Sequence, residues 1–390
     1  MKNLIRKGFR YIQRKISERI ECLRYYLMYP WARCIYKNKE VYLVSERGTD
    51  ARDNGYHFFK YICENCPEKE VYYVIDRSST DYEKVATLGN TVQYRSLKHY
   101  LLFIGAKYKI STHIMGYSPK MLYYVSFNQK HRVPGKQIFL QHGITKDNIV
   151  GLYQEVALVD IFICGAYPEY KYVSDNFHYR NGEVKYTGLA RFDNLQHNET
   201  RNQILLMPTW RQYLKTMSDA ERANSYYFLY WNRVLHDYRI IDKLKEHNMR
   251  LVFYPHYEMQ QYISSFTSDV EEVVVANFAH YDVQTLLKES RLLVTDFSSV
   301  FFDFAFMEKP VIYFQFDREM FFSTHYQKGY FDYDSMGFGE VAIEYEELIG
   351  LLIHYLDNNC KLKPVYQERI QSFFPLHDGN NCKRIMEVIN

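Results

Sequence analysis

One segment in the C-terminal third of the chain constrains the fold more than any other. Residues 291–314 read RLLVTDFSSVFFDFAFMEKPVIYF, where a strand-like apolar run is followed by polar residues, a helix-like apolar stretch and a second strand-like run. Such a strand–turn–helix–strand unit is typical of a parallel α/β sheet, whose ligands bind at the C-terminal edge of the strands. A helix start at that edge offers free N–H groups that suit phosphate. We therefore expect Asp296, Ser298 and Ser299 to lie at a phosphate site.

The rest of the chain repeats this alternation of short apolar runs and helix-like stretches. Strands that alternate with helices predict a mainly parallel sheet, and 390 residues are enough for two such domains. We expect an α/β fold with two Rossmann-like domains that face each other across a cleft. The predicted strands are 41–45, 71–75, 108–112, 137–141, 161–164 and 184–187 in the first half, and 203–207, 250–254, 273–276, 292–295 and 311–314 in the second.

The boundary between the two domains is expected just after residues 188–193, where a polar segment at 196–202 follows. Residues 37–195 then form the N-terminal domain, and residues 196–375 form the C-terminal domain. The last stretch, 376–390, is expected to be a helix, and whether it crosses back onto the first domain is left open.

Residues 1–36 combine a helical period with a strong positive charge. Residues 1–39 hold eleven Lys and Arg against two Glu, a net charge of +9, so that the remaining 351 residues carry −6. A basic amphipathic helix binds in the plane of an anionic membrane surface, with about 1 kcal/mol from each nearby Lys or Arg. Packing on the domain and a nucleic-acid arm are the alternatives, and a bilayer-spanning helix is excluded by length and apolarity. The periodic apolar residues are Ile5, Phe9, Ile12, Ile16, Ile20, Leu23 and Leu27.

Two histidines follow predicted strands, one in each domain. His142 and Gly143 come directly after 137–141, and His256 comes shortly after 250–254. A histidine with an ordinary pKa near ~6.5 can accept a proton at neutral pH, and a glycine lets a ligand approach the backbone closely. Because both strand ends lie at the binding edge of their sheets, we expect the histidines and the serines to converge on one ligand. A structural histidine that bonds to a loop carbonyl is the alternative in each case.

A third strand end places Thr209 and Arg211 at the same edge of the second domain. The planar guanidinium of Arg211 can pair with a phosphate, so we expect both residues to line the phosphate side of the cleft. A structural ion pair of Arg211 near the domain linker is the alternative.

No cofactor is firmly predicted. The chain has no GxGxxG after its first strand and no Walker A sequence, which makes dinucleotide-cofactor and P-loop interpretations weak. Asp303 and Asp317 lack a clear third ligand, and the close pair Cys63 and Cys66 has too few partners for zinc. No metal site is therefore assigned, and a requirement for a divalent metal is left open. Seven scattered Cys without a signal peptide favour reduced, cytosolic thiols.

These motifs together resemble one known family over roughly residues 40–388. The resemblance is to the CDP-glycerol:poly(glycerophosphate) glycerophosphotransferases, which are the primases and polymerases of teichoic acid and related capsule synthesis. The motifs that carry it are Gln141-His-Gly143, Pro208-Thr-Trp-Arg211, Thr295-Asp-Phe-Ser-Ser-Val-Phe-Phe-Asp303, Lys309-Pro310, Asp317, Gly329-Tyr-Phe-Asp-Tyr333, and Asp378-Gly379 with Arg384. The loop Asp53-Asn-Gly55 ahead of a predicted helix is similar to the loop of the family's first domain.

The resemblance implies a GT-B fold, with the acceptor on the first domain and the CDP-activated donor on the second. It implies that His142 is the general base and that His256 takes part in catalysis by holding the diphosphate and stabilising charge on the leaving CMP. The remaining implied residues are Ser298, Ser299, Arg211, Thr209 and Asp296 at the donor diphosphate, and Gly143, Asn54 and Gly55 in loops of close approach.

The function expected from this resemblance is transfer of a polyol phosphate to a hydroxyl, with release of CMP. The donor is CDP-glycerol or another CDP-polyol, and the acceptor is lipid-linked or a growing teichoic-acid-like or capsular polymer. The enzyme would act peripherally at the cytoplasmic face of the cell membrane, on an anionic surface and without nucleic acid. A GT-B glycosyltransferase that uses a CMP-sugar is one alternative. An inactive relative that binds a polymer or an assembly partner is the other.

Overall fold

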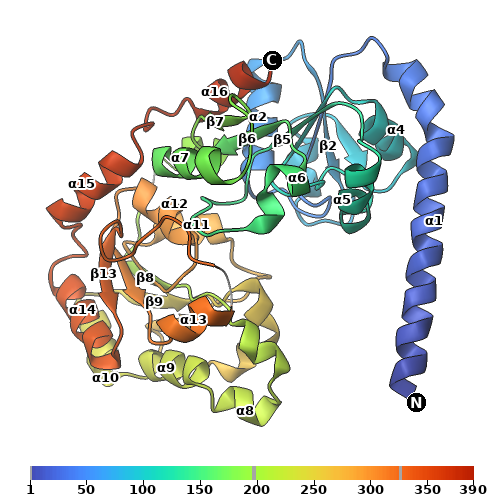
Figure 1. The fold of residues 1–390 in the computed structure, drawn as a ribbon. Helices are drawn as coiled ribbons and strands as arrows, with labels where there is room; N and C mark the ends of the chain where they lie inside the picture. The colour runs from blue at the N-terminus through green and yellow to red at the C-terminus, as the bar shows by residue number, and fades with distance from the viewer. Residues whose placement is uncertain (1, 196–198, 325–326) are drawn as a thin grey trace.

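The computed structural model describes residues 2–195, 199–324 and 327–390. The chain forms two α/β halves, each built on one sheet of parallel strands, and Figure 1 shows the first N-terminal helix running along one side of the molecule. The expected pair of Rossmann-like units is confirmed. Part of the predicted linker, residues 196–198, lies outside the described residues.

The first sheet has seven strands in the order β3-β2-β1-β4-β5-β6-β7. The chain therefore runs outward from β1 to one edge and then returns through β4 to the other, as in a doubly wound sheet. The strands are β1 Val41–Ser45, β2 Glu70–Ile75, β3 Thr91–Gln93, β4 Tyr108–Ser111, β5 Lys136–Phe139, β6 Ile161–Cys164 and β7 Val184–Tyr186.

The second sheet has six strands in the order β10-β9-β8-β11-β12-β13 and the same winding. Its reversal of strand order lies between β8 and β11, so the loops after these two strands border one crevice. The strands are β8 Gln203–Leu206, β9 Arg250–Phe253, β10 Val273–Val275, β11 Leu292–Thr295, β12 Val311–Phe314 and β13 Gly339–Ala342.

Helices cover both faces of each sheet, which is why the central strands are buried over their whole length and mainly apolar. Every residue of β1, β4, β6, β8, β11 and β12 is buried. The helices of the first half are α1 Lys2–Tyr36, α2 Asn54–Asn65, α3 Tyr82–Ala86, α4 Leu97–Gly105, α5 Met121–Lys130, α6 Gln154–Ala157 and α7 Tyr167–Asn176. Those of the second half are α8 Asp219–Ala223, α9 Tyr226–Leu235, α10 Tyr238–Glu246, α11 Val283–Glu289, α12 Val300–Phe306, α13 Arg318–Thr324, α14 Tyr345–Asp357, α15 Pro364–Phe373 and α16 Asn381–Ile389. The 3-10 helices among the described residues are η1 Val150–Leu152, η2 Ala190–Asn194, η3 Gln212–Thr216 and η4 Tyr257–Ser265.

The helix α1 packs on the first domain along one face only. Tyr25 is buried there with its ring centroid 4.7 Å from that of Phe127, and the hydroxyl of Tyr100 donates to Glu21 at 2.8 Å. At 100° per residue, the opposite face carries the periodic apolar residues. That outward stripe consists of Phe9, Ile12, Ile16, Ile20, Leu23, Leu27 and Trp31, all exposed. Within the described ranges, no helix combines the length and apolarity needed to cross a bilayer.

The last helix, α16, packs on the first domain although it follows the second. Ile385 and Ile389 are fully buried in the core beneath β1 and α2, and the hydroxyl of Tyr42 donates to the side chain of Asn390 at 2.7 Å. The segment before the second domain, η2, lies beside α16 and α2. Two crossings of the chain therefore join the halves at one side of the cleft.

Candidate active site

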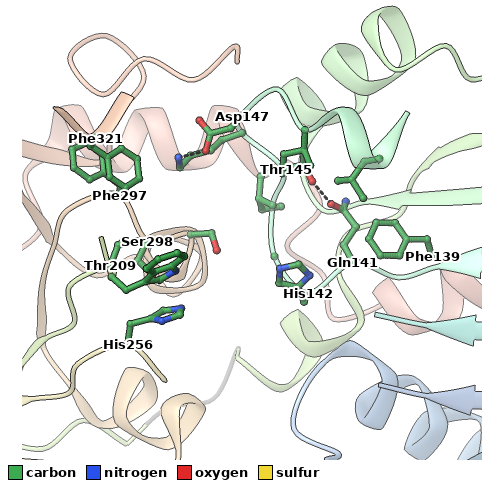
Figure 2. Close-up of a pocket in the computed structure, with 17 residues that line it drawn as sticks. Phe139, Gln141, His142, Thr145, Asp147, Thr209, His256, Phe297, Ser298 and Phe321 are labelled. Carbon is green, nitrogen blue, oxygen red and sulfur yellow. Dashed lines mark hydrogen bonds and ion pairs between the residues drawn. The ribbon is translucent and has the colours of Figure 1, made fainter. Parts of the chain in front are cut away.

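Residues predicted to share one ligand meet at a cavity of about 200 Å³ between the two domains. In Figure 2, His142 projects from the first domain and faces Thr209, His256 and Ser298, which project from the second. These four residues follow β5, β8, β9 and β11 respectively. Because parallel strands present their C-terminal ends at one edge of a sheet, the two sheets bring these groups to opposite walls of the cavity.

A buried hydrogen-bond network holds the loop that carries His142. Gln141 has a φ of 60°, a left-handed conformation that is costly for a residue other than glycine. Its side-chain amide donates to Glu169 at 2.9 Å and accepts from the hydroxyl of Thr145 at 2.5 Å, while the N–H of Thr145 donates to Glu169 at 2.5 Å. Burial raises the pKa of Glu169 to about 7, and these donors favour its charged form. The network closes the loop on both sides of His142 and fixes where its ring enters the cavity.

The imidazole of His142 is open to the cavity and stacks on His113, with ring centroids 5.0 Å apart and an interplanar angle of 12°. Protein that surrounds the ring removes water from it, which lowers the pKa of His142, and the guanidinium of Arg191 lowers it further. The carboxylate of Asp53 and a hydrogen bond to the backbone of Thr112 act in the opposite direction. Because the lowering prevails, the ring is neutral at pH 7 and offers one nitrogen as a proton acceptor.

His256 lies on the opposite wall with its proton position set by the backbone. Its Nδ1 accepts the N–H of Glu258 at 3.2 Å, so the neutral ring carries its proton on Nε2. Burial lowers the pKa of His256, against the smaller raising effects of Glu258 and Asp296. The neutral ring can therefore donate a hydrogen bond from Nε2 to an oxygen of a ligand.

Three hydroxyls complete the wall of the second domain. The hydroxyl of Ser299 makes no capping bond to α12, and that of Thr209 is buried with no hydrogen-bond partner among the described residues. A Cβ on Gly143 would lie 3.0 Å from the hydroxyl oxygen of Ser299, so the glycine permits a close approach of the two domains. With only seven residues, α12 has a small dipole. The hydroxyl-bearing residues Ser298, Ser299 and Thr209 therefore line this wall, where a hydroxyl can donate to an anion.

Arg211 and Asp296 have a different environment from the one expected. The guanidinium of Arg211 is buried and pairs with Asp317 at 2.7 and 2.8 Å and with Asp296 at 2.8 Å. Asp296 also accepts the N–H of Thr209 at 2.8 Å. Neither side chain lines the cavity. The charges pair with each other and brace the loops that carry Thr209 and Ser298, as the structural ion pair given as the alternative for Arg211 describes. Direct contact of either side chain with a phosphate stays a prediction.

Asn54 and Gly55 also pack against protein instead of a ligand. The side chain of Asn54 donates to the carbonyl of Gln141 at 2.8 Å and accepts the N–H of Arg191 at 2.9 Å. A Cβ on Gly55 would lie 3.0 Å from the side chain of Glu46, so this glycine permits α2 to pack on that residue. Both positions therefore bring protein segments close together, and a close approach of ligand to this loop stays a prediction.

A second cavity of about 210 Å³ adjoins the first at His142, and it contains a charged cluster that the sequence did not reveal. Arg191 pairs there with Asp53 and Asp303, which lie 138 and 112 residues away in the sequence. From the sequence, the segment 188–193 is interpreted only as a linker, because partners so distant in the chain cannot be recognised from the residues around Arg191. The family-like motif that ends at Asp303 was the available signal, without an indication of its partner.

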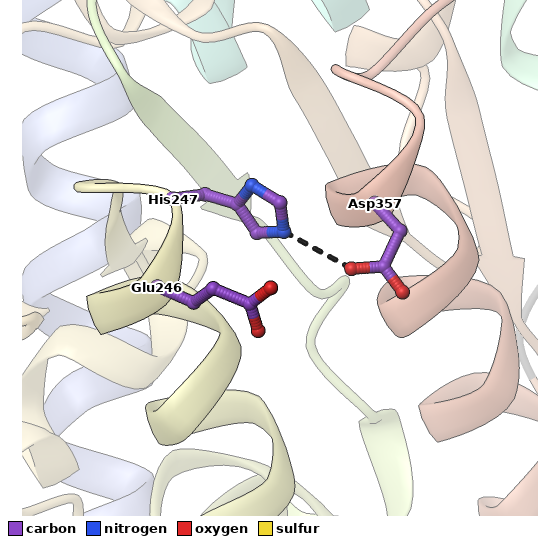
Figure 3. Close-up of side chains that lie close together, drawn as sticks. All are labelled: Glu246, His247 and Asp357. Atoms are coloured by element: carbon purple, nitrogen blue, oxygen red, sulfur yellow. Dashed lines mark hydrogen bonds and ion pairs between the residues drawn. The ribbon is translucent and has the colours of Figure 1, made fainter.

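One group of possible metal ligands lies between α10 and α14 and lines neither cavity (Figure 3). Nε2 of His247 is 3.0 Å from Asp357, and Glu246 is nearby. The ammonium group of Lys243 contacts Glu246 at 2.9 Å and Asp357 at 2.7 Å. This amine already supplies the positive charge that the carboxylates require, so we interpret the group as a surface ion-pair cluster.

Comparison with known proteins places the chain in a family. Residues 26–390 match the model of the family described as CDP-Glycerol:Poly(glycerophosphate) glycerophosphotransferase. The chain is 33% identical over 368 residues to the minor teichoic acid biosynthesis protein GgaB of Bacillus subtilis (strain 168), which covers 91% of this chain and 40% of that protein. It is 24% identical over 379 residues to a teichoic acid glycerol-phosphate transferase of Staphylococcus aureus (strain NCTC 8325 / PS 47), covering 90% and 92%. The chain thus spans well under half of the Bacillus relative.

Solved structures are similar in fold. The wall teichoic acid polymerase TagF aligns with a TM-score of 0.67 and 18% identity over 100% of this chain and 97% of that one. A UDP-N-acetylglucosamine 2-epimerase aligns with a TM-score of 0.54 and 12% identity over 90% and 95%. These likenesses confirm the expected GT-B arrangement of two Rossmann-like domains. The match of residues 26–390 shows that the chain belongs to the CDP-glycerol:poly(glycerophosphate) glycerophosphotransferase family.

Proposed function

We propose that the chain transfers glycerol phosphate, or a related polyol phosphate, from a CDP-activated donor to the hydroxyl of a lipid-linked acceptor or growing polymer. Membership of the family supports the class of donor, and the names of the relatives support a teichoic-acid-like product. The observation that carries the proposal is the cavity in which His142 faces His256, Ser298 and Ser299. One wall holds a proton acceptor, and the other holds groups that can donate hydrogen bonds to a phosphate, an arrangement that suits phosphoryl transfer.

In this reaction His142 is the general base. The acceptor hydroxyl attacks the phosphorus that bears the glycerol, and its proton passes to the unprotonated nitrogen of His142. The new oxygen–phosphorus bond forms as the bond to the bridging oxygen breaks, and CMP leaves with that oxygen. The lowered pKa of His142 keeps its ring neutral and ready at pH 7.

The wall of the second domain holds the diphosphate and stabilises charge on the departing CMP. His256, Ser298, Ser299 and Thr209 line the cavity before the donor binds, and each carries an N–H or O–H that can donate to a phosphate. Donors held in place in this way stabilise developing negative charge without reorganisation during the reaction. Arg211 and Asp296 contribute indirectly, because they fix the two loops from behind.

A donor screen tests the proposed function. The protein is incubated with CDP-glycerol, CDP-ribitol or a CMP-sugar, with and without a lipid-linked acceptor, and CMP release is measured. We expect release that depends on both a CDP-polyol and the acceptor. Release from the CMP-sugar alone would favour the glycosyltransferase alternative. Nucleotide binding without release from any donor would favour the inactive relative.

We infer that α1 lies on an anionic membrane surface through its outward stripe. The stripe is apolar and exposed, with Leu23 at 60% and Leu27 at 62%, and it faces away from the domain on which the helix packs. Basic residues in the same segment suit anionic headgroups. The packing alternative describes the inner face of the same helix, where Tyr25 and Ala32 are buried. Because the inner and outer faces of α1 are separate, the helix can pack on the first domain and contact a membrane at the same time.

Substitution of both Leu23 and Leu27 by serine is expected to weaken binding to phosphatidylglycerol vesicles at least about tenfold, because two large apolar side chains no longer enter the membrane. Vesicle sedimentation measures this, with phosphatidylcholine vesicles and added salt to report the electrostatic part. Leu229→Ser with Ile343→Ser removes two other exposed apolar groups, which lie in the second domain, and serves as the control. These substitutions leave the buried inner face in place, which deletion of the helix would not. Unchanged binding by the Leu23 and Leu27 variant would contradict the assignment.

A further inference from the structure

Arg191 occupies the place where the two walls of the cleft join. It lies in η2, and its guanidinium uses all three nitrogens. Nε and Nη2 donate to the two carboxylate oxygens of Asp303 at 2.5 and 2.8 Å. Nη1 donates to Asp53 at 2.7 Å and to the backbone carbonyl of His142 at 3.1 Å. The side chain is only 9% exposed, so these bonds are shielded from water.

Each partner belongs to an element that the proposed reaction uses. Asp53 caps the start of α2 in the first domain. His142 supplies the general base, and its carbonyl is held directly. Asp303 lies on α12, one turn after Ser299. A single planar cation therefore ties the loop of the base to the helix that directly follows Ser298 and Ser299.

We propose that Arg191 is a positioning residue that sets the distance and the charge balance between His142 and the serine-bearing start of α12. The proposal rests on the proposed function, because it assigns Arg191 a role in that reaction. The fork geometry of a guanidinium is needed, since one group must reach two carboxylates and a carbonyl in different directions. A lysine ammonium is a compact point charge and cannot hold these three groups in the fixed directions of a planar fork.

The charges around His142 make the role measurable. The charges of Asp53, Arg191 and Arg47, which lie on separate segments, act on its ring, and His113 stacks on it. Arg191 offsets the carboxylate of Asp53, which on its own raises the pKa of His142. Without the arginine, the lowering effect of its positive charge on His142 is lost, and the pKa of His142 rises. The base is then protonated at higher pH, so the acid limb of the activity profile moves upward.

Two substitutions separate geometry from charge. Arg191→Gln is expected to lower kcat for CMP release about a hundredfold, the usual effect of displacing a catalytic group by about 1 Å, and to move the acid limb to higher pH. Arg191→Lys keeps the charge but loses the fork, so it is expected to lower kcat while leaving the acid limb near its original pH. Asp303→Asn keeps the size of the side chain. It is expected to lower kcat but to move the acid limb of the pH profile less than Arg191→Gln does.

Arg384→Gln is the matched control. This arginine also braces the junction of the domains, where it contacts Thr187, Asp378 and Asn381, but it has no contact with either cavity. A purely structural role for Arg191 predicts that both arginine variants alter stability and leave the pH profile alone. Wild-type kcat in Arg191→Lys, or an unmoved acid limb in Arg191→Gln, would overturn the proposal.

A readout without turnover keeps this test separate from that of the proposed function. Histidine NMR titration reports the pKa of His142 directly, with His142→Asn to assign its signal. A raised pKa in Arg191→Gln supports the positioning role even when no donor is consumed by the wild-type protein, an outcome that would remove the proposed function alone. If Arg191→Gln does not fold, Arg191→Lys decides, because a lowered kcat with an unmoved limb supports the role and an unchanged kcat overturns it.

Discussion

Replacement of His142 by asparagine is expected to lower kcat for CMP release about a thousandfold while the protein stays folded. A positioned general base contributes roughly 10² to 10⁴ in rate, and asparagine keeps a polar side chain but cannot take up the proton. The loop itself should persist, because Gln141, Thr145 and Glu169 hold it through bonds that do not involve the imidazole. Circular dichroism checks the fold, and CMP release from CDP-glycerol with acceptor measures the rate.

The pH profile sharpens this prediction. Since the pKa of His142 is lowered, the wild-type rate should rise with pH along an acid limb centred below the ordinary histidine value of ~6.5. His142→Asn should lose that limb together with the rate. His247→Asn changes a half-buried histidine outside both cavities and should leave the profile as it is. Retention of the acid limb in His142→Asn would mean that another group is the base.

The second large effect is expected at Ser298 and Ser299. Loss of one donor held in place for a developing charge typically lowers kcat by about a hundredfold or more. Adjacent donors on one oxygen group are not independent, so the double alanine variant should lose between about a hundredfold and ten-thousandfold. The fall should appear in kcat more than in KM for the donor, because the hydroxyls act most strongly on the charge that develops in the transition state.

The chain offers a close control for the serine variant. Ser264 and Ser265 form another adjacent pair in the second domain, exposed at the end of η4 and outside both cavities. Ser264→Ala with Ser265→Ala makes the same chemical change and should leave kcat near the wild-type value. Steady-state CMP release across a range of CDP-glycerol concentrations separates kcat from KM. A rise in KM with an unchanged kcat would show that Ser298 and Ser299 bind the ground state only.

Most of the fold is predictable from the apolar runs, and the exceptions have a common cause. The strands β6, β11 and β12 begin and end as expected, because they are short, fully buried and bounded by polar residues, Gly or Pro. The two strands that the pattern misses, β3 and β13, lie at sheet edges. Of the residues in β3, only Val92 is buried, and β13 includes Gly339 and the half-buried Glu340. Such strands lack an apolar run because one side has no neighbour.

In the candidate site, features that depend on neighbouring residues are predictable from the sequence, and features that depend on distant residues are not. The position of His142, His256 and Ser298 relative to strand ends is a local property, so the sequence predicts their convergence once the sheets are parallel. The surroundings of Arg211 and Arg191 are not local. Their charges are visible in the sequence, but each is neutralised by carboxylates over a hundred residues away, at Asp317 and Asp303. A charged side chain in a motif therefore indicates importance without separating ligand contact from structural support.

The most direct test of the central claim follows one phosphorus atom. CDP-glycerol labelled in the phosphate next to glycerol is incubated with the protein and a lipid-linked acceptor, and the label is then located in acceptor and released nucleotide. Attack at that phosphorus, with His142 as base and CMP as leaving group, predicts that the label moves to the acceptor together with glycerol while the released CMP is unlabelled. Label that remains with the nucleotide, or an acceptor that gains glycerol without it, would contradict the account.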